Sequence, residues 1–164
     1  MQDKFYEYLE DKSQPTRQRA LTASSYKNKE HQLKDANTNS ELATYGDALL
    51  KLAFCKILFD ERISNITVKK QEYESDKVFV EIIARHYKLL NYIHFDENDD
   101  KIPKDYDYKP KKGKDSPSRY IATAVEALIA AIYLDNKEDF SVVVEIAKHW
   151  IELIDKALPL HYEK

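Results

Sequence analysis

The sequence predicts an all-α fold, built as a helical bundle. Its 164 residues include only two glycines and five prolines, which leaves few of the tight turns that a sheet-rich fold requires. Apolar residues recur at helical spacing over long stretches, and Ser, Thr, Asn or Asp residues precede them as candidate N-caps. The chain is 43% hydrophobic and 34% charged, which is ordinary for a globular protein, and its length fits a single domain over residues 1–164.

Proline residues and capping residues delimit the expected helices. Pro15 ends a first short helix, and Pro159 ends the last one. Helices are expected at residues 5–12, 17–26, 40–59, 76–93, 117–135 and 137–158. A further helix is expected to begin at about Thr67. Their candidate caps, in chain order, are Asn39 or Ser40, Thr67, Ser75 or Asp76, and Ser116 followed by Pro117 at the first helical position.

Two polar stretches are expected to connect the helices without regular structure. Residues 27–40, "KNKEHQLKDANTNS", are predicted to be an exposed connection. Residues 95–118, "FDENDDKIPKDYDYKPKKGKDSPS", form the one long segment without a helical pattern. A loop of this length inside a compact domain is usually functional or mobile.

Composition also excludes several classes of function. A net charge of −3 argues against coating a nucleic acid electrostatically, so RNA binding would need a local basic patch or bridging metal ions. No apolar run approaches the ~20 residues that span a bilayer, and the charged start of the chain lacks an apolar leader segment. The single cysteine rules out an internal disulfide. A cytoplasmic protein without membrane attachment is expected.

Two carboxylates lie in segments that are otherwise apolar. The expected helices at 42–59 and 120–134 are apolar on nearly every face, which predicts a central position in the bundle. Glu126 is the only charged residue from Ile121 to Leu134, so it must be protonated, hydrogen-bonded or salt-bridged between helices, or bound to a metal. Asp47 has similar neighbours, and its alternative is an ion pair with Lys51 one turn later.

Taken together, the two carboxylates favour a shared metal site. Two central helices, each with one acid, can bring Asp47 and Glu126 to one point, and Mg²⁺ prefers such oxygen ligands. Gly46 precedes Asp47 inside the helix, where a glycine costs about 1 kcal/mol relative to alanine. We interpret it as the residue that lets the two helices approach closely beside the site.

Three motifs carry a resemblance to a known family. "ALTASSYKN" at 20–28, "GDALL" at 46–50 and "EALIAAIYLD" at 126–135 occur in the order and approximate spacing of the ribonuclease III catalytic domain, and the similarity extends over about residues 17–155. The resemblance implies an all-α, homodimeric endonuclease domain that depends on Mg²⁺, with Mn²⁺ as a substitute. It implies cleavage of double-stranded RNA to 5′-phosphates and 3′-hydroxyls, with one site per subunit for each strand.

The resemblance implies Asp47 and Glu126 as catalytic residues and metal ligands, but several other signature positions differ. Full-length members carry four acids around the metals. Here Ala43 and Thr123 stand where the other two acids are usual, Ser40 replaces a further signature acid, and Ala23 replaces the usual histidine. Thr44 stands where an aromatic residue that helps lock the dimer is usual, and the neighbouring Tyr45 is a candidate substitute for it.

The Mini-III branch of the family also lacks acidic residues at the positions of Ala43 and Thr123, where it carries alanine and threonine. "LATYGD" and "TAVEALI" resemble its signatures, as do "SRYIATAVEA" and the lysine-bearing loop before it. Mini-III enzymes also lack a C-terminal double-stranded-RNA-binding domain, and none is expected here. The opening "ALTASSY" without histidine is closer to full-length enzymes.

The segment "KPKKGKDSPSR" at 109–119 is the candidate RNA contact. A solvated loop and an RNA-binding loop explain its charge about equally well, and its position before the helix of Glu126 favours RNA. Asp115 is a candidate auxiliary acid, although a loop aspartate before Ser-Pro is more often a turn or cap residue. The expected RNA-binding residues are Lys109, Lys111, Lys112, Lys114 and Arg119.

The five histidines give no sign of a metal site. Histidines at 31, 86, 94, 149 and 161 show no metal-ligand spacing and are interpreted as structural or exposed.

The favoured function is an endoribonuclease that trims structured precursor RNA, ribosomal precursors included. Whether a ribosomal protein assists it is left open. The alternatives are a catalytically weakened RNA-binding or ribosome-associated module and a purely structural dimer. Retention of both buried acids favours the enzyme.

Overall fold

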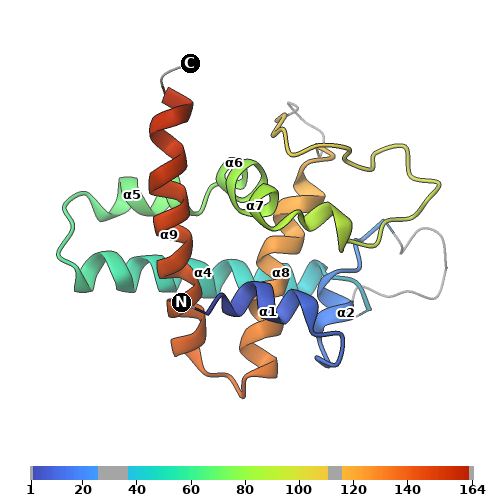
Figure 1. The fold of residues 1–164 in the computed structure, drawn as a ribbon, viewed down its shortest axis with the longest axis horizontal. Helices are drawn as coiled ribbons and strands as arrows, with labels where there is room; N and C mark the ends of the chain where they lie inside the picture. Colours follow the sequence, from blue (N-terminus) through green and yellow to red (C-terminus); the bar gives the residue numbers. More distant parts are fainter. Residues whose placement is uncertain (1, 26–36, 111–115, 163–164) are drawn as a thin grey trace.

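The fold is all-α, as the sequence predicts, in a computed structural model that describes residues 2–25, 37–110 and 116–162 (Figure 1). Within those ranges the single β-type contact is an isolated bridge between Thr22 and His94. None of the helices in the described ranges is long and apolar enough to span a membrane.

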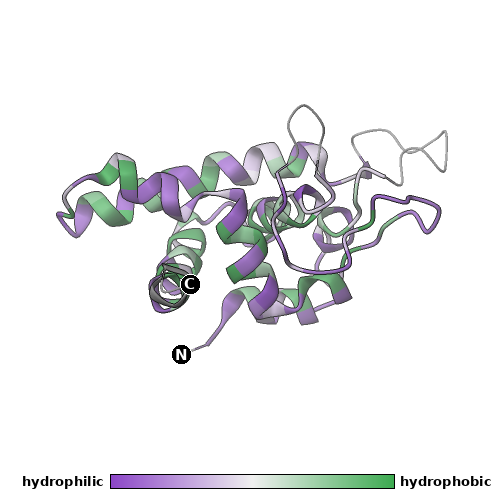
Figure 2. Cartoon of the chain, turned by 90° about the horizontal axis from the view of Figure 1, so that it is seen from above, coloured by the Kyte–Doolittle hydropathy of each residue, from purple (hydrophilic) through white to green (hydrophobic). Residues whose placement is uncertain are grey.

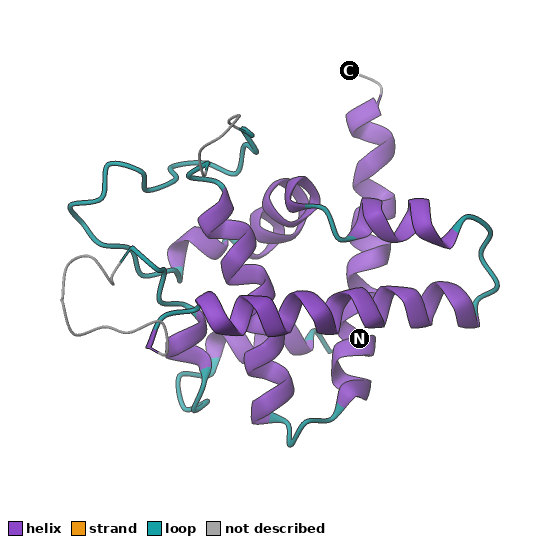
Figure 3. Cartoon of the chain, turned by 180° about the vertical axis from the view of Figure 1, so that it is seen from behind, coloured by secondary structure: helices purple, strands orange, loops and turns teal. Residues whose placement is uncertain are grey.

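Two long helices cross at the centre of the molecule. Helix α4 covers Ser40–Asp60 and helix α8 covers Arg119–Asp135, and Figure 3 shows α4 running across α8. Helix α8 is buried on nearly every face between Ile121 and Ile132, which confirms the predicted central position. Helix α9, Phe140–Tyr162, packs against both.

Gly46 allows the close crossing of α4 and α8. A Cβ atom placed on Gly46 would lie 1.7 Å from the backbone oxygen of Glu126 and 3.3 Å from the backbone nitrogen of Ala130. No side chain fits at that distance, so the two backbones touch directly at this point. The prediction that Gly46 serves close approach beside Glu126 is confirmed.

The N-terminal segment folds onto the core with a shorter second helix than predicted. Helix α1 covers Lys4–Glu10, and α2 covers only Arg17–Ala20 instead of extending to residue 26. The chain leaves helical geometry there because the segment after α2 pairs with the backbone around His94: the Ala23 N–H donates to the His94 carbonyl at 3.0 Å. Tertiary pairing therefore overrides local helix propensity.

The helix expected at residues 76–93 is irregular and ends early. Ser75 caps it, because its Oγ accepts from the Val78 N–H at 3.3 Å. The successive segments are α6 (Asp76–Val78), a π-helical stretch η2 (Phe79–Ala84), α7 (Arg85–Tyr87) and a 3₁₀ turn η3 (Leu89–Asn91). Lys88, with φ 52°, breaks the helix between α7 and η3.

Three other helix boundaries differ from the predicted ones. Helix α5 covers Ile66–Tyr73 and follows Asn65 at φ 59°, so Thr67 lies inside the helix and does not cap it. Helix α8 begins at Arg119, after a tight turn in which the Arg119 N–H donates to the Ser116 carbonyl at 2.9 Å. Helix α9 begins only after the left-handed residues Lys137 and Glu138, and it continues past Pro159. A proline so close to a helix end removes one hydrogen bond, which the helix tolerates.

The C-terminal half of α4 and helix α5 form an arm at one side of the described chain (Figures 1 and 2). The arm carries large apolar side chains in contact with solvent: Leu52 is 57% exposed, Phe59 73% and Val68 64%. The helix of residues 42–59 is therefore apolar on most faces, as predicted, but it is open on one of them. Leu52 and Phe59 are seven residues apart on α4 and so lie on one side of that helix, and large exposed apolar side chains gathered in this way are typical of an interaction surface.

Candidate active site

A cleft of about 580 Å³ lies where the N-terminal halves of α4 and α8 meet. Both predicted acids, Asp47 from α4 and Glu126 from α8, line it, so the structure brings them together as the sequence indicated. Asp76, the first residue of α6, lines it as well. Two cationic side chains complete the polar lining, Lys101 from the loop at 95–110 and Arg119 from the start of α8. Three carboxylates therefore face two cations in one cleft.

Asp47 is half-buried and makes the ion pair that the sequence offered as its alternative role. The Lys51 Nζ lies 2.8 Å from Asp47 Oδ2, and this hydrogen bond is the main reason that the pKa of Lys51 is raised. The two side chains are 48% and 35% exposed, and such an i,i+4 pair contributes only about 0.3–0.5 kcal/mol. The lysine balances the carboxylate without binding it strongly, so Asp47 remains available to a ligand.

Glu126 is half-buried, and within the described ranges its carboxylate has no hydrogen bond or salt bridge. The buried hydrogen bond and the interhelical salt bridge considered for it are therefore not found there. Burial raises its pKa to about 8, with smaller contributions from the negative charges of Asp47 and Asp76. A carboxylate held in this environment favours either a proton or a cation. Its surroundings fit a divalent metal ion, since bound positive charge relieves both burial and repulsion.

Asp76 is a site residue that sequence reasoning missed. It was considered only as a helix cap, because an acid in a first turn is already explained by the helix dipole. Its proximity to Glu126 depends on the packing of the α6–η2 segment against α8, which no local pattern reports. Lys101 was missed for a similar reason: it lies in a polar loop, and only the fold shows that the loop returns to the cleft.

Most of the positions that depart from the ribonuclease III signature line the same cleft, although Ala23 does not. Ser40, Ala43 and Thr123 all line it beside the two acids. Ala43 and Thr123 stand one helical turn before Asp47 and Glu126, so acids at those positions would face the same space. Acids at these two positions would add two carboxylates to the cleft.

The structure describes two of the five predicted RNA-contact residues. Arg119 is exposed and lines the cleft, and Lys109 is exposed on the loop that leads towards it. Lys111, Lys112, Lys114 and the candidate auxiliary acid Asp115 lie outside the described residues.

The fold and the site define a helical nuclease domain with an acidic cleft at a helix crossing, and sequence comparison supports that class. The ribonuclease III domain family matches residues 40–137, which include α4, α8 and every acid of the cleft. The chain belongs to the ribonuclease III domain family.

Curated relatives agree with this assignment. Ribonuclease 3 proteins of two Clostridium botulinum strains are 33% identical over 143 residues, and that of Clostridium beijerinckii is 34% identical over 147 residues. Each match covers 85% of this chain and 55% of the relative. The chain therefore spans about half the length of the curated relatives that it matches.

Solved structures show the same fold. Two structures of the nuclease domain of Campylobacter jejuni ribonuclease III superpose with TM-scores of 0.66 and 0.65 at 25% identity. The first covers 96% of this chain and 98% of the Campylobacter domain, and the second 94% of each. The first is described as showing structural flexibility in a region involved in dimer formation.

Proposed function

We propose that this chain is a divalent-metal-dependent endoribonuclease that cleaves double-stranded RNA. The observation that carries the proposal is the pair of carboxylates, Asp47 and Glu126, in one cleft at the crossing of α4 and α8. A protein that had lost catalysis would gain stability by replacing Glu126 with a neutral residue, since its carboxylate is half-buried and repelled by neighbouring acids.

Asp47 and Glu126 are the proposed ligands of Mg²⁺, with Mn²⁺ as a substitute. Bound there, the cation supplies a water molecule of lowered pKa and neutralises charge on the scissile phosphate. Lys51 lies 2.8 Å from the Asp47 carboxylate and balances its charge, and Asp76 adds negative charge beside Glu126. With two protein carboxylates, RNA oxygens and water would supply the other ligands of a bound ion.

Positive side chains at the edge of the cleft are proposed to bind the RNA backbone. Lys101 and Arg119 line the cleft, and the lysine-rich segment at 109–114 leads into Arg119. Double-stranded RNA is recognised mainly through phosphates and 2′-hydroxyls, which point charges satisfy without base reading. Structured precursor RNA in the cytoplasm, ribosomal precursors included, is the proposed substrate class.

A homodimer is proposed because two strands require two sites. A two-fold axis supplies a second cleft, and isologous pairing also covers the exposed apolar face of the α4–α5 arm. Light scattering at micromolar concentration should give twice the mass of the chain. A monomeric mass would contradict this part of the proposal.

Ala43 and Thr123 favour one competing function. Because acids are usual at both positions, a weakened or inactive RNA-binding module with the same fold is the second candidate. It predicts RNA binding without cleavage.

Cleavage of long double-stranded RNA separates these functions. The wild-type chain should cut the RNA with Mg²⁺ and stop when EDTA is added, and Glu126→Gln and Asp47→Asn should each reduce the rate at least a hundredfold. Asp60→Asn is the matched control, because Asp60 forms the same i,i+4 pair on α4, with Lys56 at 2.7 Å, outside the cleft. Binding without cleavage by the wild type would support the second function instead.

The basic segment is tested by binding. Changing Lys109, Lys111, Lys112 and Lys114 to alanine should weaken RNA affinity and flatten its dependence on salt, because fewer phosphate contacts release fewer counterions. An unchanged affinity with an unchanged salt slope would reject that role.

A further inference from the structure

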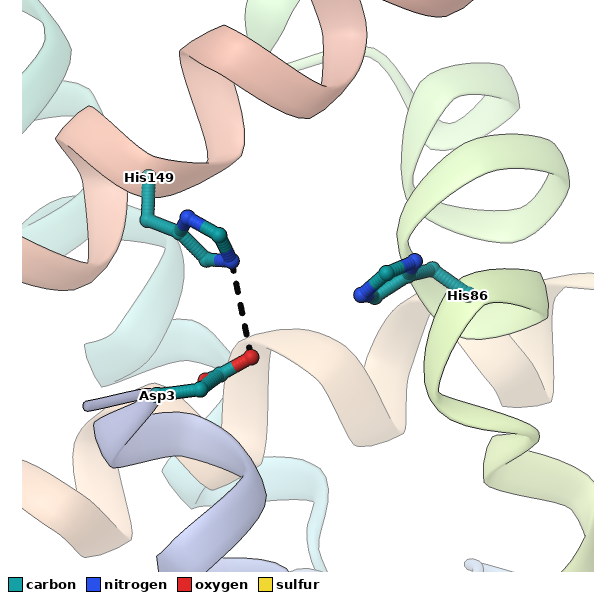
Figure 4. Close-up of side chains that lie close together, drawn as sticks. All are labelled: Asp3, His86 and His149. Atoms are coloured by element: carbon teal, nitrogen blue, oxygen red, sulfur yellow. Dashed lines mark ion pairs between the residues drawn. The ribbon is translucent and has the colours of Figure 1, made fainter. Parts of the chain in front are cut away.

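A second group of metal-ligating side chains lies outside the cleft. Asp3, which precedes α1, His86 of α7 and His149 of α9 each offer one ligand atom, and these atoms all lie within 4.8 Å of one another. Figure 4 shows the three side chains converging from three separate segments. Spacing along the chain did not indicate this group, because the fold brings together residues that are far apart in sequence.

The distances approach those of a bound transition-metal ion. Ligand bonds of about 2.0–2.1 Å in a tetrahedral zinc site place ligand atoms roughly 3.3 Å apart. The Nε2 atom of His149 already lies 3.5 Å from Asp3 Oδ2. His86 is exposed, so its ring can move the remaining distance by a change of side-chain torsion, without disturbing the core.

Hydrogen bonds hold Asp3 in position for this role. The Tyr87 hydroxyl donates to Asp3 Oδ2 at 2.9 Å, and the Tyr6 N–H donates to Oδ1 at 3.1 Å. An ionised carboxylate offers about four acceptor positions, which leaves room for a metal bond. Such support is what a metal-binding carboxylate requires.

The imidazole rings are less completely supported. The edge of the His86 ring packs against Tyr87, with 4.8 Å between ring centroids. The Nδ1 atom of His149 is buried and has no hydrogen-bond partner within the described residues. A ligating histidine normally donates its second N–H to an acceptor, and a missing acceptor lowers affinity about 10- to 100-fold. Micromolar binding is therefore expected.

We propose that Asp3, His86 and His149 form a binding site for a transition-metal dication of the Zn²⁺ type, with water in the open position. Two imidazole nitrogens and one carboxylate oxygen suit Zn²⁺, whereas Mg²⁺ prefers oxygen ligands alone. Asp3 and His86 line an open hollow of about 420 Å³, through which a hydrated ion has access. A bound ion joins the start of α1 to α7 and α9, so the site is structural and does not depend on the proposed nuclease function.

Zinc binding to the purified chain, without a histidine tag and after EDTA treatment, tests the site. Isothermal titration should show one Zn²⁺ bound per chain in the micromolar range, and Zn²⁺ should raise the melting temperature. His86→Ala and His149→Ala should each weaken binding at least tenfold and remove the thermal shift. His94→Ala is the matched control, because His94 is an exposed histidine outside the cluster.

Glu126→Gln serves as a second background, because it removes a cleft carboxylate that also attracts Zn²⁺. Zinc affinity should persist in this variant, and X-ray absorption should show two nitrogen ligands from imidazole. His86→Ala changes an exposed side chain and is expected to fold normally, so its result stands even where His149→Ala unfolds the chain. Zinc affinity unchanged in His86→Ala, or no micromolar binding by the wild type, would overturn the proposal.

Discussion

Replacing Glu126 with glutamine should stabilise the metal-free protein, and increasingly so as the pH rises. The Glu126 carboxylate is half-buried among acids, which raises its pKa from 4.5 to about 8. Between these values the folded chain keeps a proton that the unfolded chain has lost. Folded protein then binds more protons than unfolded protein, so the free energy of unfolding falls as the pH rises through this window.

The size of the effect follows from the shift. Each pKa unit corresponds to about 1.4 kcal/mol, so a shift from 4.5 to about 8 costs the wild type up to about 5 kcal/mol once the pH exceeds the folded value. Glutamine has the same shape and no charge, and it removes this loss. The difference in unfolding free energy between variant and wild type should be near zero at acid pH and reach several kcal/mol at pH values above 8.

Urea denaturation in EDTA across this pH range measures the difference. Glu152→Gln, an exposed glutamate on α9, is the control, and it should show little pH-dependent difference from the wild type. A Glu126→Gln protein that is less stable than the wild type at alkaline pH would refute the reasoning, as would a difference that does not change with pH. The first result would mean that Glu126 has a stabilising partner in the folded chain, and the second that folding does not raise its pKa.

Two further substitutions test the packing around the cleft and the anchoring of the N-terminal segment. Gly46→Ala should destabilise the fold by at least about 3 kcal/mol in urea denaturation, because its Cβ would lie 1.7 Å from the Glu126 backbone oxygen, and near-native stability would contradict the close crossing. Asp135→Asn should cost about 1.5–3 kcal/mol in the same assay, since Asp135 accepts hydrogen bonds from the Tyr8 hydroxyl and the Thr16 hydroxyl, both at 2.6 Å. No loss of stability would show that these bonds contribute little.

The central crossing was predictable from the sequence because it depends on local signals. A helix that is apolar on nearly every face is expected to be buried at the centre of a bundle, and α8 has that position. Gly46, next to Asp47 in an otherwise apolar helix, predicted the close contact between this helix and the helix of Glu126. These features depend on residue type and helical period, which the sequence states directly.

Features that depend on long-range packing were not predictable in the same way. The pairing of Thr22 with His94 shortened α2, and nothing in the segment itself indicates it. Asp76 and Lys101 reach the cleft only because the fold brings their segments to it. Asp3 and His149 are far apart in sequence, yet the His149 Nε2 atom lies 3.5 Å from Asp3 Oδ2.

The central claim is that Asp47 and Glu126 bind one divalent cation, and anomalous diffraction from crystals grown with Mn²⁺ tests it most directly. Mn²⁺ accepts the same carboxylate ligands as Mg²⁺ and scatters anomalously. The account predicts an anomalous peak between the Asp47 and Glu126 carboxylates, and loss of that peak in Glu126→Gln crystals grown under the same conditions. A cleft without a peak, or a peak that persists in the Glu126→Gln variant, would contradict it.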